Sequence, residues 1–176
     1  MKNLENALRA LKSAQTLNEL KQLYRAFALQ FHPDHGGNEE AMKQINIEFQ
    51  RLFDVLKTRQ NAEARQQHEN GNYKGFHETT ETPEEFMEIV EKLNRIPGII
   101  VELCGSWLWI SGNTKENREA LKACGCCWSH PKKLWYWRHE EDSCHKRTGK
   151  DTDMEEIRAK YGSQRMNRQG FAVVAV

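Results

Sequence analysis

The fold of this chain is decided by one eight-residue stretch, Phe31-His32-Pro33-Asp34-His35-Gly36-Gly37-Asn38. Pro33 lacks an amide hydrogen and disfavours helical geometry at the residue before it, so a helix that reaches this proline must end. Gly36 and Gly37 are expected to supply positive backbone dihedrals, after which Asn38 can cap a new helix. The stretch therefore predicts a stiff turn between two helices.

Apolar residues recur at spacings of three and four on both sides of this turn, which predicts two amphipathic helices. The first begins at a capping box, with Thr16 as the cap and Glu19 three positions later. Its stripe comprises Leu17, Leu20, Tyr24, Phe27 and Phe31, and the stripe after the turn comprises Met42, Ile45, Phe49, Leu52 and Leu56. A shorter helix is expected over residues 2–13. Matching stripes and a short turn favour an antiparallel hairpin with this shorter helix packed across it.

The side of the first long helix opposite its apolar stripe is polar. Lys21 and Arg25 lie four positions apart there, so we expect them to form a small exposed cationic ridge. Such a ridge would complement an acidic surface on a partner. The alternative is a solvated helix face that binds nothing.

Together these residues resemble the J-domain of DnaJ-type co-chaperones over roughly residues 2–58. The pattern at residues 32–43, His-Pro-Asp-x-Gly-Gly-x-Glu-Glu-x-Met-Lys, is particularly similar to the J-domains of polyomavirus T antigens. The resemblance implies that the module docks on a DnaK-type heat-shock chaperone and stimulates its ATP hydrolysis, so the chain itself is not expected to be an enzyme. The residues that the likeness assigns to chaperone binding are His32, Pro33, Asp34, Lys21, Arg25 and Tyr24.

The sequence departs from the family pattern along the helix before the turn. Gln22, Ala26 and Gln30 are neutral where family members usually carry further basic residues, which leaves the affinity and the choice of chaperone open. Two other interpretations of the turn are a simple connector and an acid/base or metal site. The second would use His32 and Asp34 together with the neighbouring His35.

Residues 59–81 lose the apolar stripe and are rich in Gln, Asn, Glu and His, which predicts a polar linker. The third helix is expected to continue to about residue 68, before Gly71 and Gly75. A semi-flexible linker would let the first module reach a chaperone while a second domain holds something else.

A second helix start, Thr82-Pro83-Glu84-Glu85, opens a tryptophan-rich region over residues 82–140. The elements expected there are a helix to Arg95, strands at 99–104 and 107–110, a helix capped by Thr114 and ending at Ala123, and strands near 126–128 and 134–138. The predicted fold class is therefore α+β: an all-α hairpin domain followed by a small helix and antiparallel-sheet domain of order α-β-β-α-β-β.

Two pairs of indoles alternate along the predicted strands. Trp107 and Trp109 share one face, as do Trp135 and Trp137, so four indoles are expected on one surface. Covered by helices, that surface would be an ordinary core. Left open, it would be a stacking platform for single-stranded nucleic acid or a peptide. The cationic side chains expected beside the platform are Lys132, Lys133 and Arg138.

Cysteine and histidine side chains gather after the second predicted helix, which raises the question of zinc. The candidates are Cys124, Cys126, Cys127, His130, His139, Cys144 and His145. Their spacing is not that of a C-x-x-C knuckle, and Cys126 and Cys127 would point to opposite sides of a strand. Small buried thiols are favoured, and no metal or cofactor is predicted.

The composition indicates a cytoplasmic protein that has reduced thiols and does not enter a membrane. Twenty-six basic and 25 acidic residues nearly cancel, so no strong global field attracts nucleic acid or anionic lipid. The five cysteines do not form a secreted disulfide framework, and no apolar run approaches the roughly 20 residues that span a bilayer. Residues 141–176 are expected to be a tail, with a short helix at Met154–Tyr161 and an apolar strand at Phe171–Val176.

The leading hypothesis is a co-chaperone whose tryptophan-rich domain selects a client protein or a location. The alternative is a nucleic-acid-binding accessory protein of replication or mobile elements that uses its J-domain-like module for complex remodelling. An inert interaction scaffold is the third possibility. The sequence names neither the client nor the chaperone.

Overall fold

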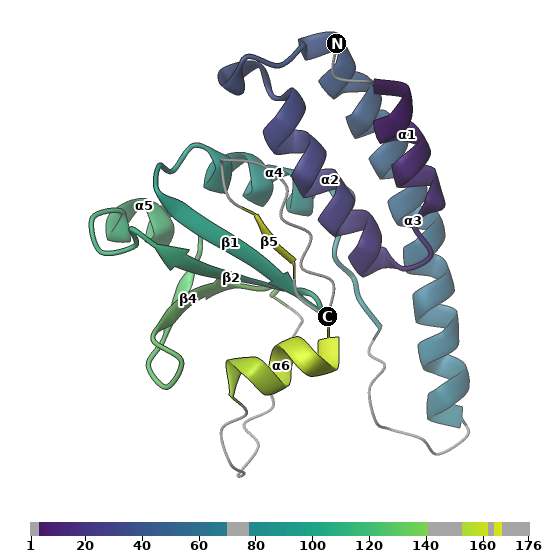
Figure 1. The fold of residues 1–176 in the computed structure, drawn as a ribbon. Coiled ribbons are helices and arrows are strands. Elements are labelled where there is room, and N and C mark those ends of the chain that lie inside the picture. Colours follow the sequence, from purple (N-terminus) through teal and green to yellow (C-terminus); the bar gives the residue numbers. More distant parts are fainter. Residues whose placement is uncertain (1–3, 70–77, 141–152, 162–163, 167–176) are drawn as a thin grey trace. The chain divides into compact units, whose positions relative to one another are not determined.

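The computed structural model describes residues 4–69, 78–140, 153–161 and 164–166 of the chain (Figure 1). It divides into two compact units, Met1–Val90 and Glu91–Val176. Helix α4, Pro83–Asn94, starts in the first unit and ends in the second. The units divide inside this helix and not at residue 82, where the sequence predicts the second domain to start, because Phe86 belongs to the core of the first unit.

The first unit is helical. Its elements are α1 (Leu4–Ser13), α2 (Leu17–Phe31), the 3-10 turn η1 (Pro33–His35), α3 (Glu39–Glu69) and the part of α4 up to Val90. Helix α1 packs against both α2 and α3, which pack against each other (Figure 1). The core between them contains fully buried Leu11 of α1 together with Leu20, Ile45 and Phe49 of the predicted apolar stripes.

The predicted helix ends around the turn are confirmed. Thr16 Oγ1 accepts a hydrogen bond of 3.2 Å from the Glu19 amide. The Glu19 carboxylate, however, accepts from the amide of Gln15 and not from that of the cap residue. Helix α2 ends at Phe31, before the proline, and Asn38 Oδ1 caps α3 by accepting from the Ala41 amide at 3.0 Å.

The two glycines of the turn serve different purposes. Gly36 has a φ of 75°, as predicted, but the expectation of a positive φ at Gly37 is wrong. Gly37 is needed for space, since a Cβ built there would lie 2.0 Å from the carbonyl oxygen of Phe31. The end of α2 therefore touches the backbone that leads into α3.

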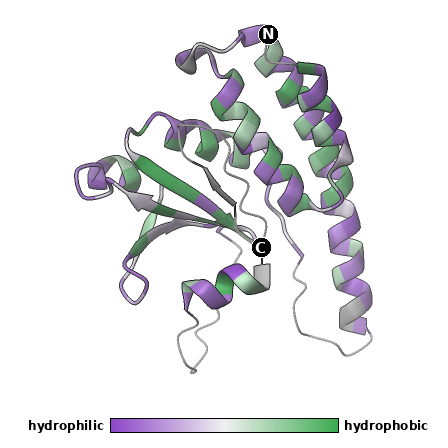
Figure 2. Cartoon of the chain, in the orientation of Figure 1, coloured by the Kyte–Doolittle hydropathy of each residue, from purple (hydrophilic) through white to green (hydrophobic). Residues whose placement is uncertain are grey.

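Helix α3 extends well beyond the part that faces α2. Figure 2 shows its colour changing from mixed green and purple beside α2 to mostly purple and pale toward Glu69. The predicted linker, residues 59–81, is therefore helical in its first part. Residues 78–82, which we name the strap, return along the extension of α3 and are described below. They cover Asn61 partly, and Ala64 on the same extension is fully buried.

The second unit is an antiparallel sheet with helices. Its strands are β1 (Ile99–Cys104), β2 (Trp107–Gly112), β3 (Cys127–Ser129), β4 (Leu134–Trp137) and β5 (Gln164–Met166), in the spatial order β3-β4-β2-β1-β5. Its remaining helices are α5 (Arg118–Ala123) and α6 (Met154–Tyr161). The α+β class and the α-β-β-α-β-β order from α4 to β4 are confirmed, and so is the short helix at Met154–Tyr161.

Three details of this unit differ from expectation. Helix α5 begins at Arg118 with Asn117 at its N-cap position, so Thr114 lies too far before the helix to cap it. Strand β5, which pairs with β1, was not predicted. The loop at residues 141–152 and the apolar end at Phe171–Val176 lie outside the described residues. No helix within the described ranges is long and apolar enough to cross a membrane.

Candidate functional site

The turn at His32 is held by its own side chain. His32 Nδ1 accepts a hydrogen bond of 3.1 Å from the Asp34 amide, which fixes η1 directly after α2. The Asp34 carboxylate lies 3.7 Å from the same nitrogen. Since Nδ1 already serves as an acceptor, the amide hydrogen bond and not an ion pair defines this contact. The His32 ring therefore locks the backbone that carries Asp34.

The turn presents a carboxylate to solvent. The Asp34 side chain is 56% exposed, whereas that of His32 is 15% exposed. Pro33 is also exposed, and it occupies the first position of η1, where its missing amide hydrogen costs nothing. This arrangement can offer an oriented carboxylate to a cationic partner. Among the residues that the structure describes, no group of three or more His, Cys, Asp or Glu side chains is placed to hold a metal ion.

Tyr24 lies in the core and not on the surface. Its ring stacks on Phe49 with 4.1 Å between centroids, and its hydroxyl donates to Asn46 Oδ1 at 3.1 Å. Only 3% of Tyr24 is exposed. It therefore positions α2 against α3 and does not reach the surface that the resemblance assigns to it.

The expected exposed ridge of Lys21 and Arg25 is wrong, because both side chains are buried, at 1% and 4% exposure. Lys21 Nζ forms an ion pair with the carboxylate of Glu81, which is also buried. The same ammonium lies over the ring of Phe53 at 5.7 Å and over that of Phe86 at 5.1 Å. Burial also lowers the pKa of Arg25 to about 10. Glu81 of the strap and Phe86 of α4 therefore cover Lys21.

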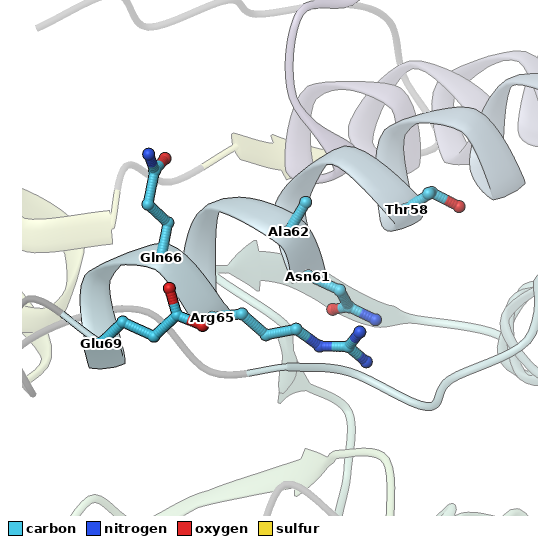
Figure 3. A pocket seen from close by; sticks show the side chains of 6 residues that line it. All are labelled: Thr58, Asn61, Ala62, Arg65, Gln66 and Glu69. Carbon is cyan, nitrogen blue, oxygen red and sulfur yellow. The ribbon is translucent and has the colours of Figure 1, made fainter.

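The strap is attached to α3 through polar contacts. The Asn61 side chain donates to the carbonyl of Thr79 at 3.0 Å and accepts from its amide at 2.9 Å. Arg65 donates twice to one carboxylate oxygen of Glu78, at 3.0 and 2.9 Å, and this pairing raises the pKa of Arg65. Figure 3 shows Asn61 and Arg65 projecting from one side of α3 and Gln66 from the other.

Two further contacts hold the end of the strap. Lys57 Nζ donates to the carbonyl oxygens of Thr80 and Glu81, at 3.0 and 2.8 Å. Thr82 and Glu85 then form a complete capping box, in which the Glu85 amide donates to Thr82 Oγ1 and the Thr82 amide donates to the Glu85 carboxylate. Glu81 thus sits in a backbone that is fixed on both sides.

A shallow pocket of about 460 Å³ lies along the same part of α3 (Figure 3). The residues that line it are Thr58, Asn61, Ala62, Arg65, Gln66 and Glu69. All six come from one helix, and they contain neither a nucleophile with a base nor a set of metal ligands. The pocket therefore suggests no catalytic chemistry.

The prediction of four indoles on one surface is wrong. Strand β4 pairs with β2 so that Trp109 faces Tyr136, while Trp135 and Trp137 face Ile110 and Leu108. Residues directly across an antiparallel pair share a face of the sheet, so Trp135 and Trp137 lie on the face opposite Trp109. The register separates the two pairs because Trp109 is matched with the residue between Trp135 and Trp137.

The face that carries Trp107 and Trp109 is covered in part by α6. Trp107 stacks on Trp109 and on Tyr136, with centroids 5.7 and 5.1 Å apart. Met154 and Ile157 of α6 pack against this cluster. Arg158 fixes α6 to the sheet by donating from two nitrogens to the Glu102 carboxylate of β1, at 2.6 and 2.9 Å. Trp109 is consequently only 5% exposed.

The predicted cations contact these rings from the edges of the same face. Lys132 Nζ lies 5.7 Å from the centre of the Trp109 ring, and the Arg138 guanidinium lies 5.6 Å from that of Trp107. Lys133 lies in the β3–β4 turn with a φ of 51°. On the other face, the ring of Trp128 contacts that of buried Trp135 edge-on and is itself 39% exposed. Of the four predicted platform indoles, Trp109 and Trp135 are therefore core, and Trp107 and Trp137 are half-buried.

The described cysteines are free thiols. Cys126 is buried, and burial raises its pKa to about 12, whereas Cys127 beside it is exposed. Cys104 lies in the aromatic cluster of the sheet. Cys144 and His145 lie outside the described residues.

Comparison of this chain with protein-family models, with curated proteins and with solved structures finds no match. The residue that sequence reasoning missed is Glu81. It lies in a polar segment 60 positions from Lys21, and no periodic pattern connects the two. The only available signal was the strong helix start at Thr82, which indicates that the backbone beside Glu81 is ordered.

Proposed function

We propose that this protein is a co-chaperone that docks on a DnaK-type heat-shock chaperone and stimulates its ATP hydrolysis. The observation that carries the proposal is the turn at residues 32–34, in which His32 locks the backbone and Asp34 extends an exposed carboxylate. The helices on both sides of this turn are packed together, so the carboxylate is presented from a rigid base.

The proposed mechanism needs no catalytic group on this chain. Asp34 would pair with a cationic side chain of the chaperone, and a carboxylate–guanidinium pair is both strong and directional. Docking would then favour the chaperone conformation that hydrolyses its own bound ATP. The second unit would supply the choice of client or location.

The arrangement of the tryptophans weighs against the alternative of a nucleic-acid-binding protein. Its platform required four indoles on one open face, but these indoles divide between two faces and Trp109 and Trp135 are buried. We therefore favour the co-chaperone function alone.

The proposal is tested by the rate of ATP hydrolysis of a DnaK-type chaperone with and without this protein. We expect stimulation by the natural sequence, and a loss of at least tenfold in stimulation for His32→Gln and Asp34→Asn, since each loses part of a single oriented contact worth about 1.5–3 kcal/mol. Circular dichroism should show the helical content of both variants unchanged.

Glu40→Gln provides a matched control. It removes one exposed carboxylate close to the turn, at the start of α3, without altering the turn itself. It should stimulate hydrolysis as well as the natural sequence does. Absence of any stimulation, or equal stimulation by Asp34→Asn and the natural sequence, would contradict the proposed function.

A further inference from the structure

We propose that the strap, residues 78–82, is an autoinhibitory segment that occupies the basic side of α2 and must be released before a chaperone can bind there. The inference rests on the proposed function. Lys21 is the cationic side chain of α2 that the strap covers, and it is 1% exposed in the closed arrangement. A partner cannot reach this charge while Glu81 and Phe86 cover it.

Glu81 carries the same kind of acidic group that we expect on the partner that it excludes. A basic helix face recognises acidic side chains, and here the buried carboxylate of Glu81 pairs with the Lys21 ammonium. An acidic segment of the chaperone would make the same contact. The strap is therefore a competitor within the chain, and it has the advantage of being covalently linked to the surface that it covers.

The attachments of the strap are of a kind that water can replace. The pair between Arg65 and Glu78 is largely exposed, and the contacts of Asn61 and Lys57 are at most partly buried. Polar contacts at a protein surface contribute little net free energy, because each group regains hydrogen bonds to water when the contact opens. Weakening these contacts to α3 should therefore make the strap open more often, while the buried pair between Lys21 and Glu81 opposes opening.

The core beside the strap is held by aromatic packing and not by polar contacts. Phe86 is fully buried and lies 5.9 Å from Phe49 and 6.2 Å from Tyr24 between ring centroids. Burial of an aromatic ring is the dominant kind of stabilising contact, so this anchor can remain when the strap leaves. Opening would then uncover Lys21 without separating α2 from α3.

The experiment weakens the strap from its solvent side. The double variant Asn61→Ala/Arg65→Ala removes the contacts to Thr79 and Glu78 and leaves every residue of α2 in place. The control Arg59→Ala/Gln66→Ala removes a guanidinium and a carboxamide from the same helix. Within the described part of the chain, Arg59 pairs with Glu63 of α3 and not with the strap.

Two quantities are measured on the full chain: stimulation of chaperone ATP hydrolysis at subsaturating protein, and the rate at which Lys21 is acylated, with exposed Lys43 as the internal standard. The apparent affinity of a closed protein is reduced by the fraction that is open. We expect the double variant to increase both quantities on the order of tenfold, since each lost contact weakens the closed state by about two- to tenfold. The control should change neither, and adding His32→Gln should abolish the stimulation again.

Each contrary result has a distinct meaning. If Lys21 acylation does not rise in the double variant, the strap is not a releasable cover and the inference is wrong. If acylation rises but stimulation stays at the level of the natural protein, the cover opens without controlling binding, and only the inference is overturned. If no variant stimulates hydrolysis even with Lys21 accessible, the proposed function fails, and the inference fails with it.

Discussion

Single residues in the first unit act through contacts that lie far away in the sequence. The ion pair between Lys21 and Glu81 joins positions 60 apart, and both partners are shielded from water. A buried pair of this kind adds little net stability, because the cost of removing two charges from water offsets their attraction. Its effect is on specificity, since a strap packed on α2 in any other register would leave a buried charge without its partner.

The two glycines of the turn allow a matched test of backbone strain against space. In Gly36→Ala the new Cβ meets no atom within 4 Å, and the only cost is the left-handed φ of 75°. We therefore expect the free energy of unfolding to fall by about 1 kcal/mol. Gly37→Ala would place its Cβ 2.0 Å from the Phe31 carbonyl and force the backbone apart, so we expect a loss of about 2–4 kcal/mol. Denaturant unfolding followed by helical circular dichroism measures both.

The opposite ranking of the two variants would contradict this description of the turn. Gly37→Ala should also weaken the stimulation of a chaperone, since the displaced backbone carries Asp34. Gly36→Ala serves as its control there, because it lies one position closer to Asp34 and disturbs less.

The thiol of Cys126 provides a pH-dependent test. Only the thiolate reacts with alkylating agents, and burial raises the pKa of Cys126 from 9.0 to about 12. At pH 8, exposed Cys127 should therefore be alkylated long before Cys126, as mass spectrometry of timed samples can measure. Comparable rates at the two sites would contradict the burial of Cys126.

The raised pKa of Cys126 also makes the stability of the folded chain depend on pH. Because the folded pKa lies above the unfolded one, the unfolded chain loses its proton first as pH rises through 9.0. Unfolding then becomes more favourable between that value and about 12. The contribution of Cys126 is fully present below pH 9.0 and decreases above it.

At the scale of elements, the register of β2 against β4 determines which aromatic residues carry stability. Trp109 is buried beneath α6 between Trp107 and Tyr136, whereas Trp128 lies on the edge strand β3 and is partly exposed. We expect Trp109→Ala to cost about 3–5 kcal/mol and Trp128→Ala less than about 1 kcal/mol. Similar costs for the two variants would contradict the burial of Trp109 beneath α6.

Tryptophan fluorescence measures this contrast directly. All five tryptophans lie in the second unit, so the signal reports on the unfolding of that unit. Helical circular dichroism, to which the first unit contributes α1, α2 and α3, can be recorded on the same samples as a second signal.

At the scale of the whole molecule, local signals predicted more than distant contacts did. Caps, prolines and apolar spacing located the helix ends at Thr16, Phe31 and Thr82, since each depends on atoms a few positions apart. The order of elements along the chain from α4 to β4 and the α+β class followed from the same kind of signal. The short strand β5 has no such pattern in its three residues, Gln164–Met166, and was missed.

The candidate site was predictable only in part, for a physical reason. The turn at residues 32–34 is a local structure, and the sequence indicated its rigid proline and its oriented aspartate. Burial of Lys21 depends on Glu81 and Phe86, which lie opposite it only after the chain has folded back along α3. The indole faces were misassigned for a similar reason, because alternation along one strand does not reveal its register with the next.

Burial of Phe86 and Glu81 in the first unit bears on where this chain can be divided. A fragment that ends at residue 58, as the motifs alone would suggest, lacks both residues and leaves Phe53, Phe49 and the Lys21 ammonium without their covering groups. Such a fragment would expose apolar rings and invite self-association. A fragment that ends at Val90, where the first unit ends, keeps both the strap and the aromatic anchor.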